Sequence, residues 1–133
     1  TSGGVAVFSS FYDFAYPVSG AIEALKSLKE SGYEVVFVST CKGFHSKSKY
    51  YWLKRHFPFM SGFIATKEKY YTRCDIIIDD RISHLNSMPD DVHCIQYMTP
   101  YTQDEAPKRE IKTCNTWNEI VEYINKLEKE INQ

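Results

Sequence analysis

Two short, unbroken runs of apolar residues constrain the fold most strongly. They lie within residues 34–40 and 75–80, and each run ends in polar residues. Runs without polar alternation are typical of strands that are buried on both faces of a parallel sheet. Parallel neighbours need long crossover connections, which are usually helices. The chain is therefore expected to alternate strands with helices.

The segments around these runs carry helix and strand signals. Helices are predicted from about residue 20 to 31, from 46 to 57 and from 116 to 127; further strands are predicted at 5–8, 62–65 and 92–96. Gly32 is placed where a helix C-terminal glycine belongs. Thr116 and Glu119 have the spacing of a capping box. Residues 97–113 are polar and contain prolines, so they are expected to form a loop.

Alternating strands and helices predict an α/β fold with a parallel sheet flanked by helices on both faces. The 133 residues fit a single domain over 1–133. No apolar run approaches the twenty residues that span a bilayer, and no secretion signal is visible, so we expect a cytoplasmic protein without a membrane segment. The four cysteines lack metal-site or disulfide-framework spacing and are read as free thiols.

The net charge of −1 hides an uneven distribution. Residues 42–73 contain eight lysines and arginines against the single acid Glu68, which gives this segment a net charge of +7. The segments on either side are acidic. A basic middle third indicates an anionic ligand there, and a solvated lysine-rich helix is the alternative.

Two predicted strands end in polar pairs, Ser39-Thr40 and Asp79-Asp80. Ligands of open α/β sheets bind at the carboxyl ends of the strands. We therefore expect the functional site at this edge of the sheet.

Several segments, in order, resemble the haloacid dehalogenase (HAD) phosphohydrolases, and more narrowly the cytosolic-type 5′(3′)-deoxyribonucleotidases. Residues 17–25 resemble the family's P-x-P-G-A-x-E-A-L segment, and residues 49–58 resemble K-x-x-W-L-x-x-x-F-P. Residues 75–80 resemble D-I-L-I-D-D, and residues 115–120 resemble N-S-W-x-E-I. The resemblance extends from about residue 16 to 125.

The resemblance implies a phosphate site with assigned roles. Thr40 would bind phosphate through its hydroxyl, and Lys69 would be the phosphate-binding lysine. Asp79 and Asp80 would be the acids on the magnesium side, because Mg²⁺ prefers oxygen ligands. The fold implied is a Rossmann-like HAD core.

The nucleophile of that superfamily is missing from the expected place. Its D-x-D motif should precede Pro17, but the only acid among the first 22 residues is Asp13. Either the nucleophilic strand lies outside this chain, or residues 5–8 form the central first strand and Phe8, Ser9 and Ser10 stand where the carboxylates belonged. The second account is favoured, because removing a central strand would leave buried strand edges unpaired.

On the second account the domain is capless, since too few residues separate the first strand from Pro17 for a helical cap. Ser9 or Ser10 has no neighbouring base in the sequence to activate it as a nucleophile. Loss of two acids also predicts that Mg²⁺ binding is weakened or lost.

Two hypotheses about function follow. The leading one is a catalytically degenerate relative, such as a small viral or bacterial regulator, that acts by binding a nucleotide, a nucleic acid or a protein near residues 42–73. The alternative is an active Mg²⁺-dependent 5′-nucleotidase whose nucleophilic strand is outside the chain. Tyrosines interleaved with these lysines, such as Tyr50 and Tyr51, are what stacking on bases or a protein interface would use. For any single tyrosine, a partly buried amphipathic side chain is the favoured interpretation.

Overall fold

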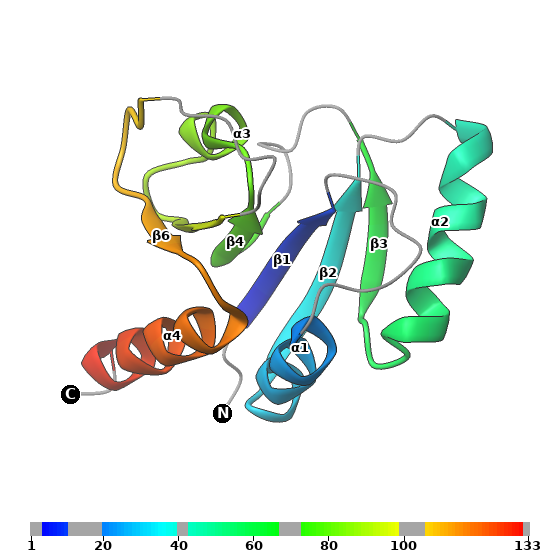
Figure 1. Cartoon of the computed structure of the whole chain (residues 1–133), viewed down its shortest axis with the longest axis horizontal. Coiled ribbons are helices and arrows are strands. Elements are labelled where there is room, and N and C mark those ends of the chain that lie inside the picture. The colour runs from blue at the N-terminus through cyan, green and yellow to red at the C-terminus, as the bar shows by residue number, and fades with distance from the viewer. Residues whose placement is uncertain (1–3, 11–19, 40–42, 67–72, 99–105, 132–133) are drawn as a thin grey trace.

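Six parallel strands form one sheet in the computed structural model of this chain, which describes residues 4–10, 20–39, 43–66, 73–98 and 106–131. The elements are β1 (Gly4–Ser10), α1 (Ala21–Glu30), β2 (Tyr33–Ser39), α2 (Gly43–His56), β3 (Gly62–Ala65), β4 (Ile76–Asp79), α3 (Ile82–Asn86), β5 (His93–Tyr97), β6 (Lys112–Cys114) and α4 (Trp117–Ile131). The strand order is β3-β2-β1-β4-β5-β6 (Figure 1). The predicted α/β class is confirmed.

β1 lies at the centre of the sheet, between β2 and β4. Val7 is in register with Val36 of β2 and with Ile77 of β4. The middle of each of these strands is apolar, which fits burial on both faces. The expectation that residues 5–8 fill the central position is therefore confirmed, and the strand is longer than predicted.

Two hydrophobic clusters cover the two faces of the sheet. The larger cluster packs Leu25 and Leu28 of α1, Leu53 and Phe57 of α2, and Ile120 and Ile124 of α4 on one face. Figure 1 shows α1 and α4 side by side and α2 at the outer edge next to β3. The smaller cluster, on the opposite face, includes Leu85 of α3. Helices therefore lie on both faces, as expected.

The predicted helix ends are confirmed at two places. Gly32 follows α1 with a φ of 106°, a left-handed conformation that glycine adopts without a steric penalty. At α4, the Thr116 hydroxyl accepts a hydrogen bond from the Glu119 amide at 3.2 Å, and a Glu119 carboxylate oxygen accepts one from the Thr116 amide at 2.8 Å. These reciprocal bonds are the predicted capping box.

Three predictions about elements need correction. The second helix begins at Gly43, three residues before the predicted Ser46. Part of the predicted loop over 97–113 forms β6, whose Lys112 is in register with Ile95 of β5. The short helix α3 was not predicted at all. Both missed elements have only three and five residues, too few to show a hydrophobic period.

Three of the four cysteines, Cys74, Cys94 and Cys114, lie in the described part of the chain, and all three are free thiols, as expected. Among the described helices, none has the length and apolar character required to cross a bilayer.

Candidate functional site

The carboxyl ends of the central strands bring the candidate site together. Ser10 of β1 is in register with Ser39 of β2, and Asp79 of β4 is in register with Gln96 of β5. Ser39, Asp79 and Gln96 are all buried, at 5% exposure or less. We call these three residues the polar row. A buried polar group costs folding free energy unless it forms a hydrogen bond, so each of these side chains needs a specific partner.

Asp79 has no exposed surface, and α3 supplies its partner. Its Oδ1 accepts a hydrogen bond from the Arg81 amide at 3.0 Å, and its Oδ2 lies 2.9 Å from Nδ1 of His84. An ionised carboxylate only accepts hydrogen bonds, so Nδ1 of His84 would donate to Asp79 in its ionised form. Asp79 is thus held by the start of the segment that follows its own strand.

Asp80 is also buried, but its hydrogen bonding differs from that of Asp79. Its Oδ1 has no hydrogen-bond partner among the described residues, and its side chain is 8% exposed. Burial, followed in size by the hydrogen bond with Asp79 and the negative charge of Asp79, raises the pKa of this carboxyl to about 7, although the positive charge of Arg81 lowers it. The Asp80 carboxyl therefore holds its proton to a higher pH than an ordinary aspartate does, and it is mostly protonated below about pH 7.

The side chain of Gln96 connects the carboxyl end of β4 to the outer strand β6 through two hydrogen bonds. Its side-chain amide donates to the Asp80 carbonyl at 3.3 Å, and its side-chain oxygen accepts from the Thr113 hydroxyl at 3.1 Å. Neither Gln96 nor the role of His84 was predicted from the sequence. A polar residue near the end of the apolar strand at 92–96 was the available signal for Gln96.

Phe8 belongs to the core and not to the site surface. Its ring lies 5.4 Å from that of Phe37 and 5.3 Å from that of Trp117, and its side chain is 3% exposed. For Ser9 and Ser10 the structure describes the backbone, which continues β1 beside Val38 and Ser39. Thr40 and Lys69 lie outside the described residues, so their predicted roles stay predictions.

The carboxylates were tested as a magnesium site. Mg²⁺ requires near-octahedral oxygen coordination. In the described ranges no cluster of three or more His, Cys, Asp or Glu side chains could hold a metal ion. Both oxygens of Asp79 already have protein partners, and Asp80 offers the one unpartnered oxygen, Oδ1. Among the described residues, Asp79 and Asp80 therefore offer a magnesium ion two carboxylates, one of them already bonded to Arg81 and His84.

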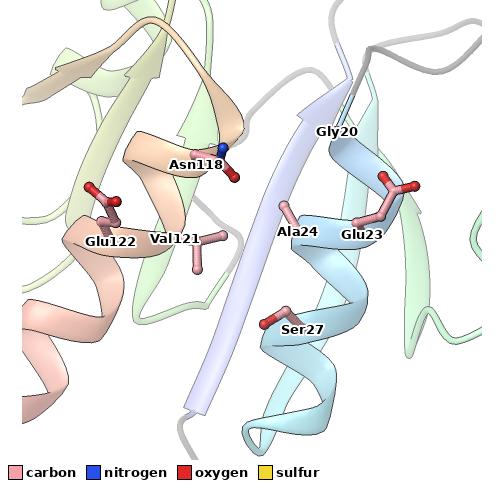
Figure 2. A pocket seen from close by; sticks show the side chains of 7 residues that line it. All are labelled: Gly20, Glu23, Ala24, Ser27, Asn118, Val121 and Glu122. Carbon is pink, nitrogen blue, oxygen red and sulfur yellow. The ribbon is translucent and has the colours of Figure 1, made fainter.

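A groove of about 580 Å³ lies between α1 and α4, away from the polar row. Figure 2 shows Asn118 and Val121 of α4 facing Ala24 and Ser27 of α1 across it. The cations of residues 42–73 are absent from its lining, which contains the acids Glu23 and Glu122. Two carboxylates would repel a phosphate, so the groove is not a candidate for the expected anion site.

The basic segment is represented in the described residues mainly by α2. Lys47, Lys54 and Arg55 are exposed on this helix, and Lys49 is partly buried. The helix contains no Asp or Glu. Four of the eight cations of the basic segment thus lie on one helix at the outer edge of the sheet (Figure 1).

Residues 7–129 match a protein family described as 5′ nucleotidase, deoxy (pyrimidine), cytosolic type C protein. The matched region begins in β1 and ends within α4, so it includes the central strands and the whole polar row. It agrees with the resemblance drawn from the sequence segments. A search of curated proteins found no match.

Proposed function

The chain belongs to this cytosolic type C 5′-nucleotidase family, and on that premise we propose that it binds a nucleoside monophosphate at the carboxyl edge of the sheet without hydrolysing it. It is a 5′-nucleotidase-like HAD protein, and the proposal is that its catalytic half has degenerated while its anion-binding half remains. A cytoplasmic location is part of the proposal and agrees with the name of the family.

One observation carries the proposal. The central strand β1 has the sequence GVAVFSS and contains no carboxylate. The HAD resemblance implies an aspartate nucleophile, with a second aspartate two residues later, at the end of this strand. A serine cannot take over the reaction without a base to activate it, and a phosphoserine formed there would be slow to hydrolyse.

The surroundings of Asp79 and Asp80 also support a degenerate catalytic half. Asp79 is engaged by Arg81 and His84, and Asp80 is buried with a raised pKa. A protonated carboxyl is a poor ligand for a hard cation, since metal ligands must be deprotonated. Both acids therefore contribute to the structure of the β4–α3 turn more directly than to metal chemistry.

Binding would rely on the residues that the resemblance assigns to phosphate. Thr40 would donate its hydroxyl to a phosphate oxygen, and Lys69 would contribute its positive charge. Fewer carboxylates at this edge leave the positive charge of the basic segment less neutralised, which favours an anionic ligand.

The alternative function is an active Mg²⁺-dependent 5′-nucleotidase whose nucleophilic strand lies outside this chain. The position of β1 between β2 and β4 weighs against it, because the central slot of the sheet is filled. An additional strand would have to displace a strand whose Val7 has no exposed surface.

Phosphate release and ligand binding together test the proposal. We expect no release of phosphate from deoxynucleoside monophosphates with Mg²⁺ present, and measurable binding of the same nucleotides by calorimetry. Lys69→Ala should weaken binding about tenfold or more, whereas Lys126→Ala, at an exposed position on α4, should leave it unchanged. Turnover that Asp80→Asn abolishes would overturn the proposal in favour of the alternative.

A further inference from the structure

The outer face of α2 carries an unusual set of side chains. Lys47, Tyr51, Lys54 and Arg55 recur at intervals of four, three and one residues, and all four are exposed. A helix turns 100° per residue, so these positions share one side, with Lys47 and Lys54 about 10 Å apart along the axis. We call these four residues the α2 stripe.

No described carboxylate in this part of the chain neutralises the stripe. Residues 43–66 contain four lysines and arginines and no Asp or Glu. Just before this range, Glu34 is paired with Lys29 at 3.0 Å and also bonded to the Ser61 hydroxyl. Among the described residues 43–66, the stripe therefore carries charge of one sign, which attracts an extended anion.

The tyrosine in the stripe does not serve the core. Leu53 and Phe57 of the same helical region are 1% and 2% exposed, whereas Tyr51 is 60% exposed. Its ring lies 5.6 Å from that of Tyr50, and Tyr50 is itself within 5.7 Å of the Lys54 ammonium. An exposed aromatic ring beside positioned cations offers a flat surface that is held in place by its neighbours.

We propose that the α2 stripe binds single-stranded nucleic acid, with Lys47, Lys54 and Arg55 contacting phosphates and Tyr51 stacking on a base. Cations that follow a backbone, combined with an aromatic ring, are the features by which single strands are bound without sequence preference. An acidic peptide would use the cations but has no planar bases for Tyr51. This surface lies on α2 and not in the polar row, so the inference goes beyond nucleotide binding at the sheet edge.

Fluorescence anisotropy with a labelled oligothymidylate that lacks a terminal phosphate tests the inference. We expect Tyr51→Ala to weaken binding about 5- to 100-fold and Tyr51→Phe to preserve it, because stacking needs the ring and not the hydroxyl. Lys47→Ala with Lys54→Ala should reduce the slope of log affinity against log salt by about 0.7 for each lost phosphate contact. The matched control is Lys26→Ala with Lys126→Ala, two exposed lysines on α1 and α4.

Three results would overturn the inference: no binding at 50 mM salt, equal binding by Tyr51→Ala and the unchanged chain, or full displacement of the oligonucleotide by an equal concentration of polyglutamate. Circular dichroism of each variant establishes that it is folded. Since the probe carries no phosphate monoester, Lys69→Ala should leave its binding unchanged. Failure of this experiment is thus separable from failure of nucleotide binding at the sheet edge.

Discussion

Nδ1 of His84 lies 2.9 Å from Oδ2 of Asp79, and this contact joins the short helix α3 to the end of the central strand β4. The carboxylate has no exposed surface, while the imidazole is partly exposed. The acid that the HAD resemblance assigns to the magnesium side is therefore held by a protein partner. A structural role for Asp79 has consequences for stability that can be measured.

Replacing His84 should destabilise the fold. His84→Ala removes the partner of a fully buried carboxylate oxygen, and a buried charged group left without a partner costs about 1–3 kcal/mol or more. Urea unfolding of the variant should show a correspondingly lower free energy of unfolding. The matched control is His93→Ala, since His93 is exposed on β5. An equal, small effect of both substitutions would show that the His84–Asp79 contact does not stabilise the fold.

Magnesium should have little effect on thermal stability. If the loss of two acids from the site weakens Mg²⁺ binding to a dissociation constant near or above 10 mM, mass action gives almost no stabilisation. Melting temperatures in 10 mM MgCl₂ and in 1 mM EDTA should then lie within about 2 °C of each other. CaCl₂ at the same concentration controls for ionic strength. A rise of several degrees that is specific to Mg²⁺ would contradict the interpretation of Asp79 and Asp80.

The Asp80 carboxyl should make stability fall as the pH rises. Its pKa is raised to about 7, above the value near 4 of an unfolded chain, so the folded state binds the additional proton between these values. The stabilisation is complete below about pH 4 and is lost as the pH rises through about 7. Above pH 7 the folded state must bury the charge.

Asp80→Asn should remove this dependence, because an amide has the same shape and does not ionise. Above pH 7 the variant should be more stable than the unchanged chain, and the slope difference between pH 4 and 7 should be on the order of 1 kcal/mol per pH unit. Urea midpoints at pH 4.5, 6 and 8 provide the measurement. Asp90→Asn, at an exposed position, should follow the unchanged chain. Parallel pH profiles for all three proteins would refute the raised pKa.

The sequence was sufficient to predict the order of the strands around β1. Unbroken aliphatic runs mark buried parallel strands, and such runs are informative because tertiary burial and local pattern agree there. The resemblance to HAD proteins then placed the first strand at the centre of the sheet. The structure confirms that order and the match over residues 7–129 confirms the family.

The contacts within the polar row could not be predicted in the same way. His84 reaches Asp79 because α3 turns back over the end of β4, and this five-residue helix has too little periodicity to be recognised. Gln96 reaches Thr113 only because β6 pairs with β5, and Lys112–Cys114 contains no apolar run. Such contacts depend on the packing of short elements, which the sequence pattern does not reveal.

The capping box of α4 gives a further prediction about stability. Thr116→Ala removes the hydroxyl that accepts from the Glu119 amide, and loss of an N-terminal cap costs about 1 kcal/mol. Thr116→Ser keeps the hydroxyl and should restore most of the stability. Thermal unfolding of the two variants compares these effects, and equal melting temperatures would show that the hydroxyl does not stabilise the helix.

Glu119 should give the same helix end an acid dependence. Hydrogen bonds from the backbone amides of Asn115 and Thr116 lower the pKa of its carboxyl below the usual value near 4.5. The stabilisation is therefore present above the unfolded-chain pKa and is lost as the pH falls through the lower folded value. Glu119→Gln should reduce stability at pH 7 and flatten its decline between pH 5 and 3. The matched control is Glu122→Gln, at an exposed position one turn later. The stability of this variant should decline as the pH falls in the same way as that of the unchanged chain. If Glu119→Gln declined as steeply as this control, the carboxylate of Glu119 would have no role in capping α4.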